Sequence, residues 1–435
     1  MHSNGNLRHR RKAAMTDEPL TRQIRAARSR FAAMAATYGL GVFNDSFFRQ
    51  AAMLMLASGG AKHRQGWIIA VFTLPYLFFA APAGWLADRF AKRHVVIAAK
   101  GLELAAIICG AVGVIAGNWV LITAMVFMMG LQSCLFSPAL NGAIPELYPP
   151  QYVARANAVL KVVVTAMILS GIAAAGFALA RTGTGWFGAP AGHWIVALGA
   201  VAIAAAGVAV SFGVPRRRAA SPTASFPRGG PAETLRQLAA IRRDLLLAAV
   251  VAATVAAWFA GSLLMPLINA LATDQFGGPT DVDLASYLVS AEVAGVAIGG
   301  LAGARLAAGR RWWRLIPAGM GAMAVLLILM AAAPALPAPA RLPATFVVLA
   351  LVGVAGGMFL VPCEAFIQVR PAADRRGTVI ASVNFAVFAG ILLSGPAANA
   401  LIATVAPTTG MAILGAVMAA AAIGLGRALA REDKR

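Results

Sequence analysis

The chain has 435 residues, of which 60% are hydrophobic and only 12% are charged, and its mean hydropathy is +0.76. These values lie far outside the composition of soluble domains and indicate an integral membrane protein. The net charge of +21 would suggest a nucleic-acid partner for a soluble chain, so the positions of the charges decide what that number means.

Apolar segments separated by short polar breaks follow one another along nearly the whole chain. A helix of about 20 mostly apolar residues is long enough to cross the hydrocarbon core of a bilayer. The frequent Gly and Pro residues fit such helices, which tolerate both. We therefore predict an all-α integral membrane fold of twelve transmembrane helices, or spans, which begin near Phe31, Trp67, His94, Trp119, Ala154, His193, Leu245, Leu284, Leu315, Thr345, Val379 and Met411.

Basic residues gather in alternate loops. Thirty Lys and Arg residues fall on the side of the two termini, whereas the opposite side holds four, namely Lys62, Arg64, Arg181 and Arg341. By the positive-inside rule, both termini are cytoplasmic. The basic charge is thus explained by topology first and by attraction to the lipid bilayer second, and we expect no nucleic-acid partner.

The first thirty residues contain "RHRRK" but no apolar stretch typical of a cleavable signal peptide, so the first span is expected to direct insertion. We expect residues 1–30 to form a basic cytoplasmic tail that is disordered or folds into a short surface helix. Cys109, Cys134 and Cys363 all fall inside spans, and this odd, buried set predicts neither a disulfide framework nor a metal site.

The longest polar break divides the chain into two sets of six spans. It runs over residues 214–244, where Leu235, Leu238 and Ile241 recur at helical spacing and predict a short helix on the membrane surface. The predicted domains are a tail (1–30), an N-terminal six-helix bundle (31–213), a cytoplasmic interdomain loop (214–244), a C-terminal six-helix bundle (245–430) and a short cytoplasmic tail (431–435).

A repeated motif links the two halves. "GWLADRFAKRH" from Gly84 follows the second span, and "GGLAGARLAAGRR" from Gly299 follows the eighth. Two six-helix bundles related by an internal repeat are the architecture of many secondary transporters. The first copy resembles the loop signature of the major facilitator superfamily, with Gly84, Asp88, Arg89 and Arg93 at its key positions, whereas Gly303 replaces the acid in the second copy. The resemblance implies halves that rock to expose a central cavity to each side in turn.

A narrower resemblance rests on "GVFNDSFFRQAA", "ANAVLKVVVTAMILSGIAAAG" and "GGMFLVPCEAFIQ" followed by "RRGTVIASVNF". Together these segments resemble the lysophospholipid transporter (LplT) family, some members of which are fused to acyltransferase domains. The resemblance implies movement of lysophospholipids across the bacterial inner membrane for re-acylation. It places a headgroup-binding acid at Asp45, with Asn44 beside it. We expect no fused enzyme in this chain and a separate acyltransferase as a possible partner.

Asp45 and Arg49 lie four residues apart in the first span, so a helix places them on one face. Asp45 lies about 21 Å into the span, at 1.5 Å per residue, where a charge costs about 2.5 to 3.5 kcal/mol. A zwitterionic headgroup needs a carboxylate for its ammonium and a cation for its phosphate. We predict that the two side chains pair without substrate and exchange partners when a headgroup enters.

Five further charged residues lie within the spans. Lys100 is expected to reach the cytoplasmic surface. A pair of Lys100 with Glu103 is equally compatible with a purely structural role and with a role in a functional site. Lys161 is expected to attract phosphate, and Glu292, which has no basic neighbour at helical spacing, is a candidate proton carrier. Glu364 is interpreted as a solvated gate residue near the cytoplasmic end of its span.

The loop signature predicts a gate. Asp88 would lie by the start of the eleventh span, at Arg376 of "RRG", where exposed backbone N–H groups attract an anion. This contact would hold the cytoplasmic side shut. Arg89 and Arg93 would reach acidic or lipid groups, although simple anchoring by the positive-inside rule explains either arginine equally well.

Three functions remain open at this stage. The sequence contains no P-loop and no zinc-ligand spacing, so we expect neither an ATP-driven pump nor an enzyme, and no cofactor. The leading interpretation is a lysophospholipid transporter. The alternatives are a proton-coupled exporter of drugs or other amphiphiles, with the proton on Asp45 or Glu292, and a membrane sensor or scaffold without transport activity.

Overall fold

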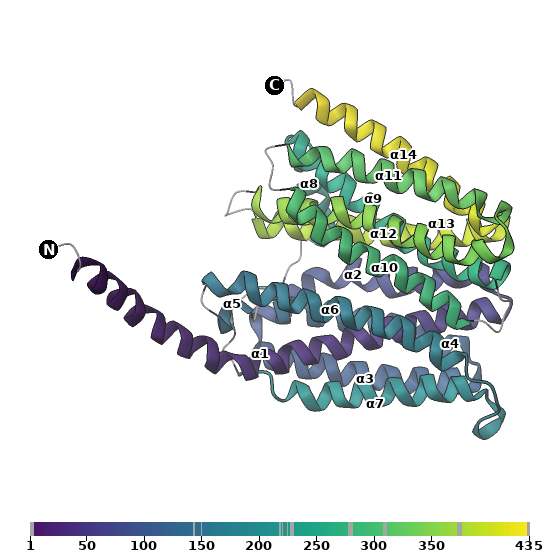
Figure 1. The fold of residues 1–435 in the computed structure, drawn as a ribbon. Helices are drawn as coiled ribbons and strands as arrows, with labels where there is room; N and C mark the ends of the chain where they lie inside the picture. Colours follow the sequence, from purple (N-terminus) through teal and green to yellow (C-terminus); the bar gives the residue numbers. More distant parts are fainter. Residues whose placement is uncertain are drawn as a thin grey trace.

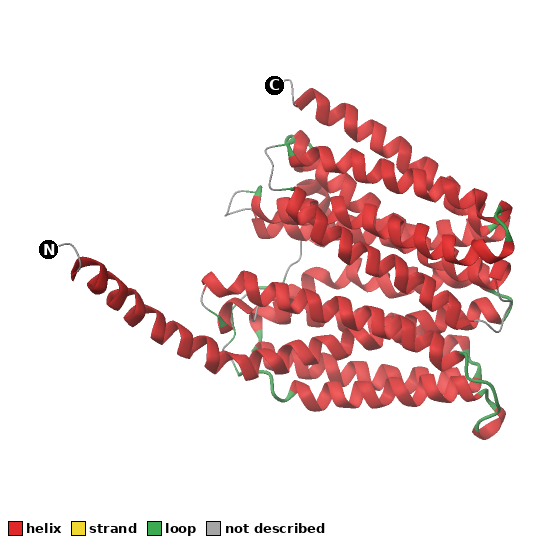
Figure 2. Ribbon diagram, in the orientation of Figure 1, coloured by secondary structure: helices red, strands yellow, loops and turns green. Residues whose placement is uncertain are grey.

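The computed structural model is helical over almost all of the chain that it describes, which comprises residues 4–141, 144–148, 150–216, 219, 221–223, 225–226, 230–276, 282–307, 311–371 and 376–432 (Figure 2). The first half contains helices α1 (Asn4–Ser58), α2 (Gln65–Arg89), α3 (Lys92–Ala116), α4 (Trp119–Asn141), α5 (Ile144–Leu147), α6 (Pro150–Leu179) and α7 (Ala191–Ser211). The second half contains α8 (Gly230–Ile241), α9 (Leu245–Leu271), α10 (Val282–Leu306), α11 (Leu315–Leu329), α12 (Ala338–Val369), α13 (Arg376–Thr404) and α14 (Pro407–Glu432).

Eleven helices in the described part of the chain are long and apolar enough to cross a membrane. Helix α1 is not among these eleven, although its second half packs against α6 and α7. Of the two expectations for the tail, disorder is wrong, because α1 is helical from Asn4, and the helix is not a short separate one, because it runs without interruption into the predicted first span. The exact count of twelve spans therefore stays a prediction.

The helix beginnings agree with the predicted spans to within a few residues, except in α1, which begins at Asn4, and in α12. This helix begins at Ala338, well before the predicted Thr345. Pro337 is its N-terminal flanking residue and Pro339 lies in its first turn. Proline near the start of a helix is compatible with it, because the first turn has no intrahelical acceptors for its N–H groups.

The same pattern of helix contacts occurs twice, and it separates an N-half (α1–α7) from a C-half (α9–α14). In the N-half α1 packs on α6, α2 on α4 and α3 on α7, and in the C-half α9 packs on α13, α10 on α12 and α11 on α14 (Figure 1). The halves meet where α2 packs on α13 and α10 packs on α6. These two contacts are related by the same repeat.

Close packing of α10 on α12 depends on glycine. A Cβ atom at any of several positions would overlap a backbone carbonyl of the facing helix, as at Gly295 with Ala350, Gly299 with Val354 and Gly303 with Met358. Small residues allow membrane helices to approach closely. The acid of the first motif copy therefore has no room at Gly303.

Both chain termini lie at the same end of the helices (Figure 1). We call this the terminal end, and it also carries α5 and α8. The opposite end, called the far end, carries the short helical turn η1 (Lys62–Arg64) and the beginning of α10.

Candidate functional site

Asp45 is held by a neighbouring helix of the same half. Its carboxylate accepts a 2.5 Å hydrogen bond from Ser133 Oγ and a 3.3 Å hydrogen bond from Gln132 Nε2, both on α4. The side chain is only partly buried. A charged group that is deep in a membrane helix, partly accessible and hydrogen-bonded on one side is arranged to accept a further ligand from the other.

Arg49, one turn farther along α1, has a different environment. Its Cζ atom lies 5.1 Å from the centroid of the Phe72 ring, and its buried Nε atom has no hydrogen-bond partner. Within the described residues no ion pair joins Arg49 to Asp45. The predicted ion pair is therefore wrong for this conformation, because Ser133 and Gln132 take the carboxylate while the guanidinium packs on an aromatic ring.

Asn44 belongs to a separate buried cluster between α1, α3 and α7. Its Nδ2 atom donates to Glu103 Oε1 at 3.4 Å and to the Ala200 carbonyl at 3.2 Å, and Glu103 forms a 2.5 Å ion pair with Lys100. Both charged side chains are 1% exposed, and the Lys100 ammonium faces the Phe136 ring at 5.1 Å. The prediction that Lys100 reaches the surface is wrong, because its counter-ion and this ring hold it inside the half.

Lys161 and Glu364 connect the two halves. Lys161 Nζ on α6 lies 3.2 Å from Glu364 Oε2 on α12, with side-chain exposures of 68% and 26%. Glu292 on α10 is buried, and its carboxylate shares no hydrogen bond or ion pair with Asp45 or Arg49 among the described residues. The structure thus links Lys161 with Glu364, which were predicted independently, but it does not bring Glu292 to Asp45.

The far end is closed by a buried amide network that spans both halves. Gln50 Nε2 on α1 donates to Asn269 Oδ1 at 3.0 Å and to Ser286 Oγ at 3.3 Å, and Asn269 Nδ2 donates to Gln65 Oε1 at 2.9 Å. All four side chains have an exposed fraction of 0%. An ion pair between Lys62 and Asp274 lies at the same end, at 2.5 Å.

Backbone packing closes the same end. The Gly66 N–H donates to Asn399 Oδ1 at 2.8 Å, and a Cβ atom on Gly66 would overlap the Gly395 carbonyl. The backbones of α2 and α13 are thus in direct contact at Gly66 and Gly395, beside the Asn399 hydrogen bond. The far end of the interface is therefore tightly packed as well as hydrogen-bonded.

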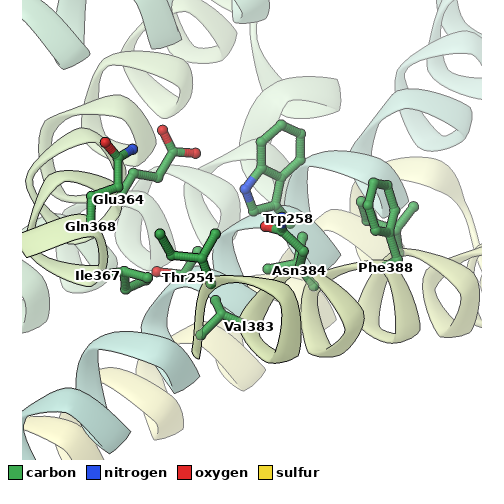
Figure 3. Close-up of a pocket in the computed structure, with 11 residues that line it drawn as sticks. Thr254, Trp258, Glu364, Ile367, Gln368, Val383, Asn384 and Phe388 are labelled. Atoms are coloured by element: carbon green, nitrogen blue, oxygen red, sulfur yellow. The ribbon is translucent and has the colours of Figure 1, made fainter. Parts of the chain in front are cut away.

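An open pocket lies between α9, α12 and α13, and we call it the C-half pocket. Its volume is about 220 Å³, and its lining includes Thr254, Trp258, Glu364, Gln368, Asn384 and Phe388 (Figure 3). Phe388 stacks on Tyr76 of α2 with ring centroids 4.1 Å apart. The pocket thus adjoins the interface between the halves.

The proposed gate falls partly outside the described side chains. Arg376 is the first residue of α13, but its side chain lies outside the described part of the structure, so the predicted contact with Asp88 stays a prediction. Arg89 lies over the Trp85 ring at 5.5 Å, Arg93 lies in the first turn of α3, and a Cβ atom on Gly84 would meet no atom within 4 Å. The Asp88 carbonyl accepts a hydrogen bond from the Ser221 N–H of the central loop at 2.9 Å.

Several site residues were not anticipated, although each left a sequence signal. Ser133 and Gln132 are adjacent polar residues in the apolar span "MMGLQSCLFSP", and Gln50 and Asn269 are isolated amides in apolar spans. A polar group within a membrane span needs a partner, so each of these positions marks a contact. No group of three or more His, Cys, Asp or Glu side chains suited to a metal occurs among the described residues.

The chain matches known transporters in sequence and structure. Residues 30–269 match the family model of the Major Facilitator Superfamily. The "Lysophospholipid transporter LplT" of Salmonella schwarzengrund (strain CVM19633) is 32% identical over 314 residues, which is 69% of each chain, and its counterpart in Salmonella typhimurium (strain LT2) is 31% identical over the same shares.

Solved structures agree in fold. The xylose transporter XylE from E. coli, in an inward-open conformation, has a TM-score of 0.65 at 14% identity, covering 91% of this chain and 95% of that one. A bacterial homologue of the human lysosomal transporter Spinster, in an inward-facing conformation, has a TM-score of 0.64 at 14% identity, with the same coverage. The chain is thus a multi-pass inner-membrane transporter that belongs to the major facilitator superfamily and, within it, to the LplT family.

Proposed function

We propose that this chain moves lysophospholipids across the bacterial inner membrane by alternating access, with the headgroup bound at Asp45 and Arg49. The observation that carries the proposal is the environment of Arg49, which lies deep in a membrane helix, forms no direct ion pair among the described residues and has a buried Nε atom without a hydrogen-bond partner. A cation with unused hydrogen-bonding capacity inside a membrane span favours a bound anion. The phosphate of a lysophospholipid supplies this anion.

The same face of α1 suits the rest of the headgroup. The Asp45 carboxylate is partly accessible, and among the described residues it accepts hydrogen bonds from α4 alone, which leaves acceptor capacity for an ammonium group. Lys161, which is largely exposed at the interface between the halves, adds a cation that attracts phosphate. The relatives named as lysophospholipid transporters support this substrate class.

The decisive experiment measures transport of labelled ethanolamine lysophospholipid in proteoliposomes, with and without a pH gradient. We expect transport that does not require the gradient. Protein-free liposomes and liposomes with the Asp45→Ala variant serve as controls. Absence of lysophospholipid movement by the wild-type protein contradicts the proposal.

A second candidate function is a proton-coupled exporter of other amphiphiles. The buried carboxylate of Glu292 favours it, because no hydrogen bond or ion pair holds this group in the described part of the chain. This function requires transport that stops when the pH gradient is collapsed. A Glu292→Gln variant that retains gradient-independent lysophospholipid transport argues against it.

We also propose that residues 31–213 and 245–430 move as two rigid bundles. The substrate leaves the protein chemically unchanged and is then available to a separate acyltransferase.

Both termini are cytoplasmic in this proposal. The distribution of Lys and Arg supports this orientation. A cysteine at Ser221 should be protected from an impermeant reagent added to intact cells. Its rapid modification contradicts the orientation.

A further inference from the structure

The C-half pocket is too small for a whole lipid but large enough for a headgroup. Its volume of about 220 Å³ is below the roughly 300–1,000 Å³ of pockets that enclose drug-sized ligands. Glu364 lies five residues from the last residue of α12, whereas Trp258 lies thirteen residues into α9. The pocket therefore extends from near the terminal end toward the middle of the helices.

The lining of this pocket suits a positively charged organic group. The Glu364 carboxylate and the Trp258 indole extend to the same side of the pocket, with the Gln368 and Asn384 amides nearby (Figure 3). Trp258 is 41% exposed, so its ring is available for contact. A carboxylate together with an accessible indole face is a combination that recognises ammonium groups, through charge and through cation–π attraction.

The carboxylate is occupied by an exchangeable partner. Lys161 reaches Glu364 from the other half at 3.2 Å, and both side chains keep solvent access. Exposed ion pairs contribute only about 0–1 kcal/mol, so a ligand ammonium can displace Lys161. The displaced Lys161 ammonium is then free to meet the phosphate of the same ligand.

Aromatic rings connect this pocket with the Asp45 site. Phe388, which lines the pocket, stacks on Tyr76, and the Tyr76 ring lies 6.2 Å from the Phe72 ring. Phe72 in turn packs against Arg49. Movement of the Phe388 and Tyr76 rings would open a direct route from the pocket to the charged face of α1.

We propose that the C-half pocket is an entry site for organic ammonium groups, in which Glu364 exchanges Lys161 for the ligand ammonium and the Trp258 indole packs against it. As an entry step for a zwitterionic headgroup, the assignment rests on the proposed function. The Phe388–Tyr76 stack separates this entry site from the Asp45 site in the present conformation.

Binding of dodecyltrimethylammonium to the full chain in nanodiscs tests the site, because this probe has an ammonium and an acyl-like chain but no phosphate. Glu364→Gln should weaken binding at least about tenfold, and Trp258→Leu about threefold to tenfold. Asp244→Asn is the matched control, since Asp244 is also a partly exposed carboxylate in an ion pair, here with Arg370, and lies near the terminal end outside the pocket lining. Unchanged binding in Glu364→Gln, or an equal loss in Asp244→Asn, overturns the proposal.

A gain of binding provides a second, opposite readout. Lys161→Met removes the competitor of the ligand, so dodecyltrimethylammonium should bind several-fold more tightly, an effect that a fold-stabilising ion pair does not predict. Weaker binding in this variant overturns the exchange. Tetramethylammonium, which lacks the chain, separates a free cation from an amphiphile: competition by this ion at equal concentration indicates a headgroup-only site, and weak competition indicates that the chain contributes.

The two proposals fail in different ways. If the wild-type protein binds dodecyltrimethylammonium through Glu364 but moves no lysophospholipid, the entry site stands and the proposed function fails. If the wild-type protein moves lysophospholipid while Glu364→Gln retains both binding and transport, the proposed function stands and the entry site fails.

Discussion

At the far end, the N-half and the C-half are joined by a fully buried network of amides and a hydroxyl, a salt bridge and a glycine contact between backbones. Nearer the terminal end, Lys161 of the N-half and Glu364 of the C-half form an exposed ion pair. Leaving a buried amide without its hydrogen-bond partner costs about 1–3 kcal/mol, whereas an exposed ion pair contributes about 0–1 kcal/mol. The contacts at the far end therefore stabilise this conformation, and the halves should separate first at the terminal end.

Among the variants that test this comparison, the one that disrupts the backbone contact between α2 and α13 at the far end should have the largest effect on transport. Gly66→Ala places a methyl group against the Gly395 carbonyl, so the far end cannot close and transport should fall to background. Distances between spin labels at Ser58 and Thr404, measured in nanodiscs, should lengthen. Gly261→Ala is the matched control, because its Cβ atom meets nothing within 4 Å. Wild-type transport by Gly66→Ala would show that closure does not depend on this contact.

Removal of the central amide should have a smaller effect. Asn269→Leu removes the donor to Gln65 Oε1, whereas Gln50 keeps its bond to Ser286, and an unsatisfied buried amide oxygen costs about 1–3 kcal/mol while the far end is closed. Water satisfies this oxygen once the end opens, so the same label pair should show a second, longer distance. Thr73→Val controls for lost polarity, since the Thr73 hydroxyl donates only within its own helix, to the Ile69 carbonyl. A single short distance in Asn269→Leu contradicts the role of the network.

The smallest effect is expected at the terminal end, for the ion pair between Asp244 and Arg370 within the C-half. Burial raises the pKa of Asp244, but hydrogen bonds from Arg370 and the Leu247 N–H outweigh this and hold the pKa below its ordinary value. The stabilisation is thus present at neutral pH and is lost as the pH falls below about 3.9 through the lowered pKa. Asp244→Asn should reduce the unfolding free energy by about 1 kcal/mol or less at pH 7. A thermal unfolding midpoint that is equally sensitive to acid in wild type and variant contradicts this assignment.

The fold was predictable because its signals are local and repeated along the chain. The apolar spans, the central polar break and the motif at Gly84 identified a duplicated membrane bundle before any contact was known. The structure adds the reason why the second motif copy lacks its acid, since the Met358 carbonyl occupies the space beside Gly303.

The partners of the charged residues were less predictable, because helix spacing describes only one helix at a time. The spacing of Asp45 and Arg49 is correct for a pair, yet Ser133 and Gln132 lie on α4, far away in sequence, and bind the carboxylate instead. Lys100 and Glu103 do form an ion pair, but contacts with α1 and Phe136 bury it inside the N-half instead of leaving Lys100 at the membrane surface. Cross-helix contacts of this kind depend on tertiary packing.

The most direct test of the central claim is transport of ethanolamine lysophospholipid by Asp45→Ala, Arg49→Ala and the double variant, at matched protein content in proteoliposomes. If the two side chains bind the headgroup, both single variants and the double variant lose transport although each stays folded and inserted. If they only stabilise the fold, any loss of transport follows a loss of folded protein, and transport per folded protein stays at the wild-type level. We predict an inactive but folded double variant, and wild-type transport by this variant would contradict the headgroup assignment.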